Sequence, residues 1–124
     1  MIMKKEDIEL YEELLSKLIS IKNDVALLSS KKPGEQLNLF KIKRINDVLT
    51  KINTLIGKDK PYEDFETFDE VALPTNSDAL MMINLYLTGM SRFKKHNSTE
   101  KSVGLDWNQT EMVWDLEDKR DEEE

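Results

Sequence analysis

The sequence contains no cysteine, one histidine, four glycines and three prolines. Without cysteine the chain cannot form a disulfide, a thiolate zinc site or a cysteine nucleophile. The scarcity of glycine and proline disfavours a turn-rich β-sandwich. The chain also has no run of about 18 apolar residues that would predict a membrane span, and its beginning lacks the apolar core of a signal peptide. We therefore expect a cytoplasmic protein.

The motifs of common ligand sites are missing as well. Neither the phosphate-loop pattern G-x-x-x-x-G-K-[ST] nor the dinucleotide pattern G-x-G-x-x-G occurs in the sequence. The acid-rich stretches lack the glycine and the ligand spacing of a calcium loop. We expect no metal, no cofactor and no catalytic activity.

What the sequence does contain is charge and apolar residues in helical proportion. Charged residues make up 35% and hydrophobic residues 39% of the 124 positions. This composition is typical of an all-α protein, and the length fits one domain. We predict a single helical domain over residues 1–120, followed by an acidic tail at 121–124 that frays into solvent.

The net charge of −7 is unevenly distributed. Residues 1–60 carry 12 basic and 9 acidic side chains, whereas residues 61–124 carry 6 basic and 16 acidic ones. The acids gather in two stretches, at 61–78 and at 106–124. A chain charged in this way gains little from general attraction to phosphates, so we expect no direct binding of nucleic acid.

Apolar residues recur at spacings of 3 and 4 in two stretches, which predicts two amphipathic helices. The first helix should run from about Lys5 to Ser29 and the second from about Glu35 to Ile56. Pro33 and Gly34 separate them, and so short a connection predicts antiparallel neighbours. The recurring positions are Tyr11, Leu14, Leu18, Ile21, Val25 and Leu28 in the first helix and Ile42, Ile45, Leu49, Ile52 and Ile56 in the second.

Two further helices are predicted from capping patterns. Thr75 and Asp78 resemble a capping box, so the third helix should begin there and reach about Lys95. Asn108 and Glu111 form a similar pattern, which predicts a short helix over about 109–120. The predicted fold is an all-α antiparallel helical bundle of three long helices plus a short C-terminal helix.

The stretch "YEDFETFDE", residues 62–70, combines three aromatic rings with five carboxylates and no base. It lies in a connection of 18 residues, Lys58–Thr75, which is long for a helical bundle. We interpret Phe65 and Phe68 as plugs of the core and expect Tyr62 to be partly exposed. The alternative is an exposed epitope for a basic partner. With the phenylalanines as plugs, four acids should form an outer rim: Asp64, Glu66, Asp69 and Glu70.

The two tryptophans have little periodic framework around them. They either dock the last segment onto the helices or anchor a partner, because tryptophan is favoured at binding hot spots. The candidate partner-binding residues are Tyr62, Asp64, Glu66, Asp69, Glu70, Trp107 and Trp114.

Three functions from different classes fit these features. The first is a non-catalytic protein–protein interaction module, or a small subunit of a larger assembly, that binds through apolar helix faces and an acidic rim. Its partner would be a protein, with a basic protein among the alternatives, and we expect either a homo-oligomer or a subunit of a heteromeric assembly. The second is an acidic nucleic-acid-mimicking inhibitor of a nucleic-acid-binding enzyme. The third is RNA cleavage by Arg92 and His96, which share one helix face.

Overall fold

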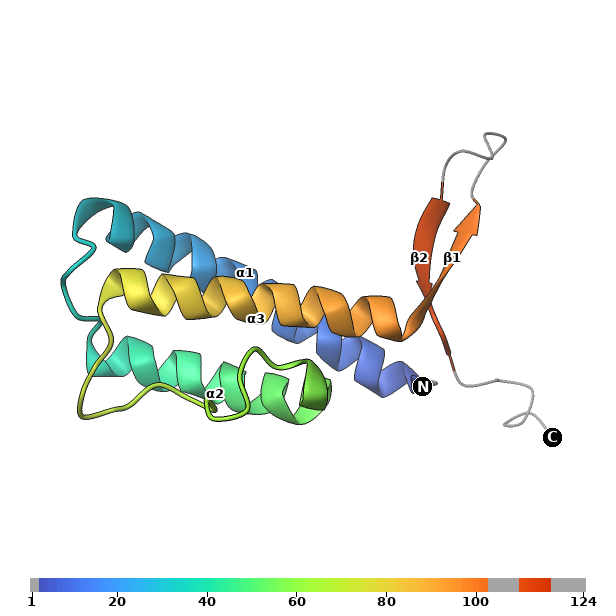
Figure 1. The fold of residues 1–124 in the computed structure, drawn as a ribbon, viewed down its shortest axis with the longest axis horizontal. Coiled ribbons are helices and arrows are strands. Elements are labelled where there is room, and N and C mark those ends of the chain that lie inside the picture. The colour runs from blue at the N-terminus through green and yellow to red at the C-terminus, as the bar shows by residue number, and fades with distance from the viewer. Residues whose placement is uncertain (1–2, 103–109, 117–124) are drawn as a thin grey trace.

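The computed structural model describes residues 3–102 and 110–116, and these residues are mostly helical. Within these ranges no helix combines the length and the apolar content that a bilayer crossing requires. In chain order the elements are α1 (Lys5–Lys31), α2 (Leu39–Ile56), the short 3-10 helix η1 (Gly57–Asp59), α3 (Asn76–His96), β1 (Ser98–Ser102) and β2 (Thr110–Trp114) (Figure 1).

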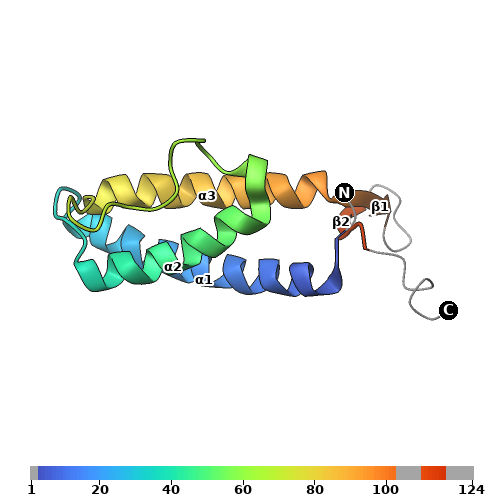
Figure 2. The ribbon, with the colours of Figure 1, turned by 90° about the horizontal axis from the view of Figure 1, so that it is seen from below.

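The path of the chain makes α2 and α3 run in the same direction, with α1 opposite to both (Figures 1 and 2). The connection from α1 to α2 is short. The connection from η1 to α3, by contrast, leads back along α2 to the end where α2 began. The expected antiparallel order therefore holds for α1 with each other helix but not for α2 with α3. The long crossover is the reason, because it returns the chain before α3 begins.

The core follows the apolar seams that the sequence predicted. Tyr11 is buried in it, and its hydroxyl donates a hydrogen bond to the carbonyl of Met90 over 2.8 Å. Burial, with a smaller contribution from the charge of Glu12, raises the pKa of Tyr11 to about 12. The largest fully buried side chains among the described residues are Tyr11, Tyr86, Leu14, Leu18, Leu37, Ile42, Leu49, Ile52, Ile83 and Met90.

Helix α2 begins later than predicted, at Leu39 rather than near Glu35. Asn38 caps it, since its side chain accepts a hydrogen bond from the Lys41 amide over 2.9 Å. The preceding residues are extended and pair with the segment before α3, where the Leu37 amide donates to the Pro74 carbonyl over 3.0 Å. Leu37 is thus buried without being helical, although it falls within the helix predicted from about Glu35.

The beginning of α3 matches the capping prediction. The Thr75 hydroxyl accepts a hydrogen bond from the Asp78 amide over 3.2 Å. Next to it, the buried Asn76 donates from its side chain to the carbonyl of Lys32 over 2.8 Å. This bond fastens the α1–α2 connection to the first turn of α3.

The predicted C-terminal helix over 109–120 is wrong for the described part of that range. Thr110–Trp114 forms β2, which pairs antiparallel with β1, so that Ser98 faces Trp114 and Ser102 faces Thr110. Directly after β2, the Asp115 carbonyl accepts a hydrogen bond of 2.6 Å from the Met3 amide. Pairing on both sides satisfies backbone groups that a short, weakly amphipathic helix would leave to solvent. Residues 117–120 and the capping residue Asn108 lie outside the described residues.

Candidate functional site

The acidic segment, defined as residues 62–70, is fastened to α2 by the side chain of Asn46. Its amide nitrogen donates to the Phe68 carbonyl over 2.9 Å, and its oxygen accepts from the Phe68 amide over 2.9 Å. Asn46 is only 7% exposed, so both bonds lie in a buried setting where an unpaired polar group would be costly. The two bonds thereby fix the position of Phe68 along α2.

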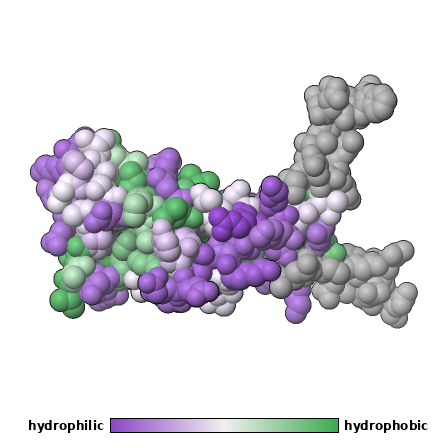
Figure 3. Space-filling view, viewed as in Figure 1, coloured by the Kyte–Doolittle hydropathy of each residue, from purple (hydrophilic) through white to green (hydrophobic). Residues whose placement is uncertain are grey.

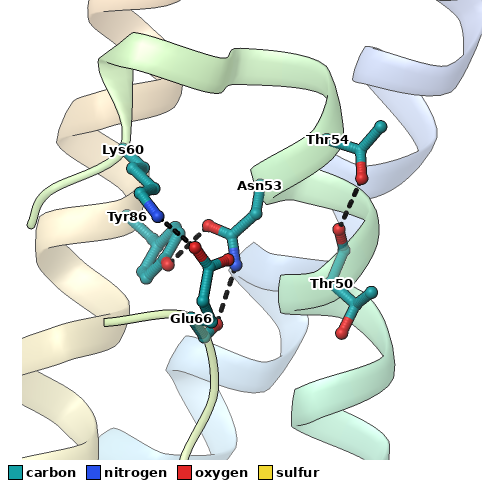
Figure 4. Close-up of polar contacts among 6 residues, drawn as sticks. All are labelled: Thr50, Asn53, Thr54, Lys60, Glu66 and Tyr86. Carbon is teal, nitrogen blue, oxygen red and sulfur yellow. Dashed lines mark hydrogen bonds and ion pairs between the residues drawn. The ribbon is translucent and has the colours of Figure 1, made fainter. Parts of the chain in front are cut away.

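A second asparagine on α2 holds the segment at Glu66, two residues before Phe68 (Figure 4). The side chain of Asn53 donates to the Glu66 carbonyl over 2.7 Å and accepts from the Tyr86 hydroxyl over 2.6 Å. Asn53 therefore links the segment to α3 through α2. Burial raises the pKa of Tyr86 to about 12, an effect that its hydrogen bond with Asn53 opposes and the charge of Glu66 reinforces.

The aromatic rings of the segment separate into buried and exposed ones, as predicted. Phe65 and Phe68 meet edge to face with their centroids 5.2 Å apart, and Phe65 also lies 6.1 Å from the ring of Tyr86. Phe68 is buried and Phe65 is partly buried against the core. Tyr62, in contrast, is 50% exposed. The interpretation of the two phenylalanines as plugs is confirmed.

The four rim acids are all exposed, but they do not have equal roles. Glu66 forms an ion pair with Lys60 beside Asn53 (Figure 4). Asp69 accepts hydrogen bonds from the amides of Val71 and Ala72 over 2.7 and 3.0 Å, and these bonds lower its pKa. Both residues thus stabilise the local backbone. Asp64 and Glu70 make no side-chain hydrogen bond or ion pair with other described residues.

Trp114 packs on the helices, whereas Trp107 lies outside the described residues. The Trp114 ring meets Tyr11 edge to face at a centroid distance of 4.8 Å and lies 6.4 Å from Phe93. The ammonium group of Lys94 sits 5.5 Å from its centroid. These contacts favour the docking interpretation for Trp114, which fastens β2 to α1 and α3.

Arg92 and His96 lie four residues apart on α3, and no hydrogen bond joins their side chains in the described part of the chain. His96 instead places Nδ1 3.1 Å from the carboxylate of Asp59, which is 4% exposed in η1. Arg92 is exposed on α3. The contact with Asp59 accounts for the position of the His96 ring without a catalytic role. The RNA-cleavage hypothesis stays a prediction.

The η1 turn also comes close to α3 at Gly89. A Cβ atom at this position would lie 2.5 Å from the Asp59 carbonyl oxygen, so only glycine fits without movement. Gly89, Asn46 and Asn53 were not among the residues predicted from the sequence. Polar and small residues at inward positions of otherwise apolar helices were the available signal, although their partners are distant in the chain.

The described residues contain no group of three or more histidine, aspartate or glutamate side chains placed to hold a metal ion. Comparisons of the chain with protein-family models, with curated proteins and with solved structures gave no match. No known family therefore assigns a role to the acidic segment or to the residues that hold it.

Proposed function

We propose that the protein is a non-catalytic protein–protein interaction module of the cytoplasm, in which a bundle of three long helices presents an apolar surface and an acidic segment to a protein partner. The observation that carries this proposal is a set of large apolar side chains left in solvent. Phe40 is 73% exposed, Val71 93% and Met81 56%. Binding of a partner over these side chains is favourable, because it removes apolar surface from water.

These exposed side chains come from one end of the molecule. The last turns of α1 and the first turns of α2 and α3 meet there, next to the part of the crossover that precedes α3 (Figure 1). The space-filling view shows hydrophobic residues mainly over this half, and hydrophilic residues toward the strands (Figure 3). We define the apolar end by Leu27, Leu39, Phe40, Val71 and Met81, which come from three helices and the crossover and lie around this end rather than on one face.

The acidic segment runs along α2 toward this end, from Lys60 and Asn53 to Asn46 at the middle of the helix, and supplies charge rather than apolar contact. Because Asn46 and Asn53 anchor its backbone at Phe68 and Glu66, its exposed carboxylates project from a fixed chain path. Fixed charges of one sign favour partners of opposite charge and speed the encounter with them. An apolar contact flanked by such charge matches the usual layout of a protein interface.

The test is affinity capture with the tagged chain and with the double variant Phe40→Ser/Val71→Ser. The matched control is Leu116→Ser, because Leu116 is 48% exposed at the opposite end. We expect a partner retained at moderate salt by the wild-type chain and the control, and lost with the double variant. Equal retention by all three proteins would contradict binding through the apolar end.

A second candidate, the nucleic-acid mimic, has one observation in its favour. The five carboxylates of residues 62–70 are all exposed along a segment fixed to the helices. An inhibitor of this kind would bind a basic groove through charge, so its capture should fail as salt rises. Capture that survives at moderate salt favours the interaction module, and capture confined to low salt favours the mimic.

A further inference from the structure

The first two helices leave a groove on the side of α2 that the acidic segment does not cover. Its floor is apolar, and it forms a shallow hollow of about 420 Å³ that is open to solvent. Three basic side chains stand around it together with one acid, Asp47. We call this the basic groove and define it by Leu14, Ile21 and Val48 on the floor and Lys17, Arg44 and Lys51 around the edge.

The bases of the groove are only partly neutralised by their own chain. Lys17 pairs with Glu13 and Arg44 with Asp47, each over 3.1 Å, and all four side chains are at least half exposed. Lys51 has no carboxylate within 4.0 Å among the described residues. Exposed pairs of this kind are weak and exchange readily for a better partner.

The acidic segment has the complementary character. It carries five acids and no base, and Tyr62 at its start is half exposed. A hollow of the size found in the groove can take one aromatic side chain, and tyrosine is among the residues that most often anchor interfaces. Glu63 and Asp64 follow Tyr62 directly, so they would meet the bases at the groove's edge.

A chain cannot fill its own groove with this segment. The segment is fixed to the α2 side that carries Asn46 and Asn53, whereas Arg44, Val48 and Lys51 lie on the α2 side next to α1. The side-chain spacing of a helix separates these two sets. The complementary surfaces can therefore meet only between two molecules.

We propose that the basic groove of one molecule binds the acidic segment of a second copy, with Tyr62 inserted between α1 and α2. This inference rests on the proposed function and names its partner. Each copy offers one groove and one segment, so the same contact can join successive copies or close a pair. The contact is electrostatic at its edge and apolar at its centre, and self-association should weaken as salt screens the charges.

The experiment uses the purified full chain and two charge-reversed variants. The groove variant is Lys17→Glu/Arg44→Glu/Lys51→Glu. The segment variant is Glu63→Lys/Asp64→Lys/Glu70→Lys, which spares the two acids with local contacts. Molar mass is measured by light scattering and sedimentation over a wide concentration range, with circular dichroism to check that each variant folds.

We expect the wild-type chain to self-associate. Each variant alone should associate at least about tenfold more weakly, because like charges would then face each other. Mixing the two variants should restore the wild-type mass, since the reversed groove of one now fits the reversed segment of the other. The control Lys22→Glu/Arg92→Glu changes charge away from both surfaces and should associate as the wild type does.

Three results would overturn the proposal: a wild-type chain that is monomeric throughout, reversed variants that associate normally, or a mixture that stays unassociated although both variants fold. If a reversed variant fails to fold, the milder changes Lys17→Gln/Arg44→Gln/Lys51→Gln and Tyr62→Ala answer the same question. A monomeric chain that still captures another protein through Phe40 and Val71 would overturn only the second copy as the partner, and would leave the interaction module standing.

Discussion

Asn46 and Phe68 are joined by two hydrogen bonds of 2.9 Å, so that a helix side chain serves as the partner of a backbone 22 residues away. Replacing Asn46 with leucine would leave the buried amide and carbonyl of Phe68 without partners. We expect a loss of about 2 to 4 kcal/mol in the free energy of unfolding, measured in urea. Asn84→Ala, at an exposed position of α3, is the control and should change stability by about 0.5 kcal/mol or less. A leucine variant as stable as the control would contradict the anchoring role.

The rings of the acidic segment should differ in what they contribute to stability. Phe68→Ala should cost about 3 to 5 kcal/mol, because it removes a buried ring. Phe65→Ala should cost less, since Phe65 is only partly buried. Tyr62→Ala should leave the midpoint of thermal unfolding almost unchanged. A large loss of stability on changing Tyr62 would show that its ring belongs to the core.

Gly89 should not tolerate even a methyl group. Alanine normally stabilises a helix interior by about 1 kcal/mol relative to glycine. At this position its Cβ would lie 2.5 Å from the Asp59 carbonyl oxygen and 3.5 Å from Ile56, so we expect Gly89→Ala to destabilise the fold by about 1 to 3 kcal/mol. The matched control is Gly34→Ala, where no atom lies within 4 Å. If both variants gain stability, the approach of η1 to α3 is looser than described.

High pH should unfold the protein through its buried tyrosines. The folded-state pKa values of Tyr11 and Tyr86 are raised from 10.0 to about 12. The stability linked to their neutral form is therefore fully present below pH 10 and lost as pH rises through 12. Tyr11→Phe/Tyr86→Phe should flatten this decline in denaturant titrations at successive pH values. Parallel curves for the variant and the wild type would contradict this assignment.

The RNA-cleavage hypothesis makes a prediction that separates it from packing. If His96 transfers protons, His96→Ala should abolish RNA turnover. If it only positions η1 through Asp59, the variant should lower stability, and neither protein should turn over RNA. Assays of both purified proteins on a single-stranded RNA, combined with thermal unfolding, decide between the two. Equal turnover by both proteins would also remove the catalytic role.

The long apolar seams were predictable from the sequence, because spacings of 3 and 4 allow few alternatives to a helix. The seam at Tyr11, Leu14 and Leu18 is buried as expected. The beginning of α2 was not predictable, since Leu37 fits the apolar pattern but is buried through an extended pairing with Pro74. A local pattern records that a residue is apolar, not which backbone conformation buries it.

The site shows the same limit. The contrast between Phe68 and Tyr62 followed from their place in the segment, whereas the anchoring by Asn46 and Asn53 did not. Asparagine within an apolar helix pattern signals a buried partner, but the partner's identity depends on a contact distant in sequence. The strand at Thr110–Trp114 was missed for a related reason, because its pairing partners lie at Ser98–Ser102.

The bond between Met3 and Asp115 brings the first and last described segments side by side, so the path of the chain is nearly a closed ring. A flexible linker could join the two ends, and the chain could then be opened at Gly34, where the backbone is exposed. The new ends would emerge beside the first turn of α3, because Pro33 and Glu35 bond to Ser77 and Asn76. A domain fused there would shield the apolar end while leaving the basic groove in solvent, and would separate the two surfaces without altering any side chain that forms them.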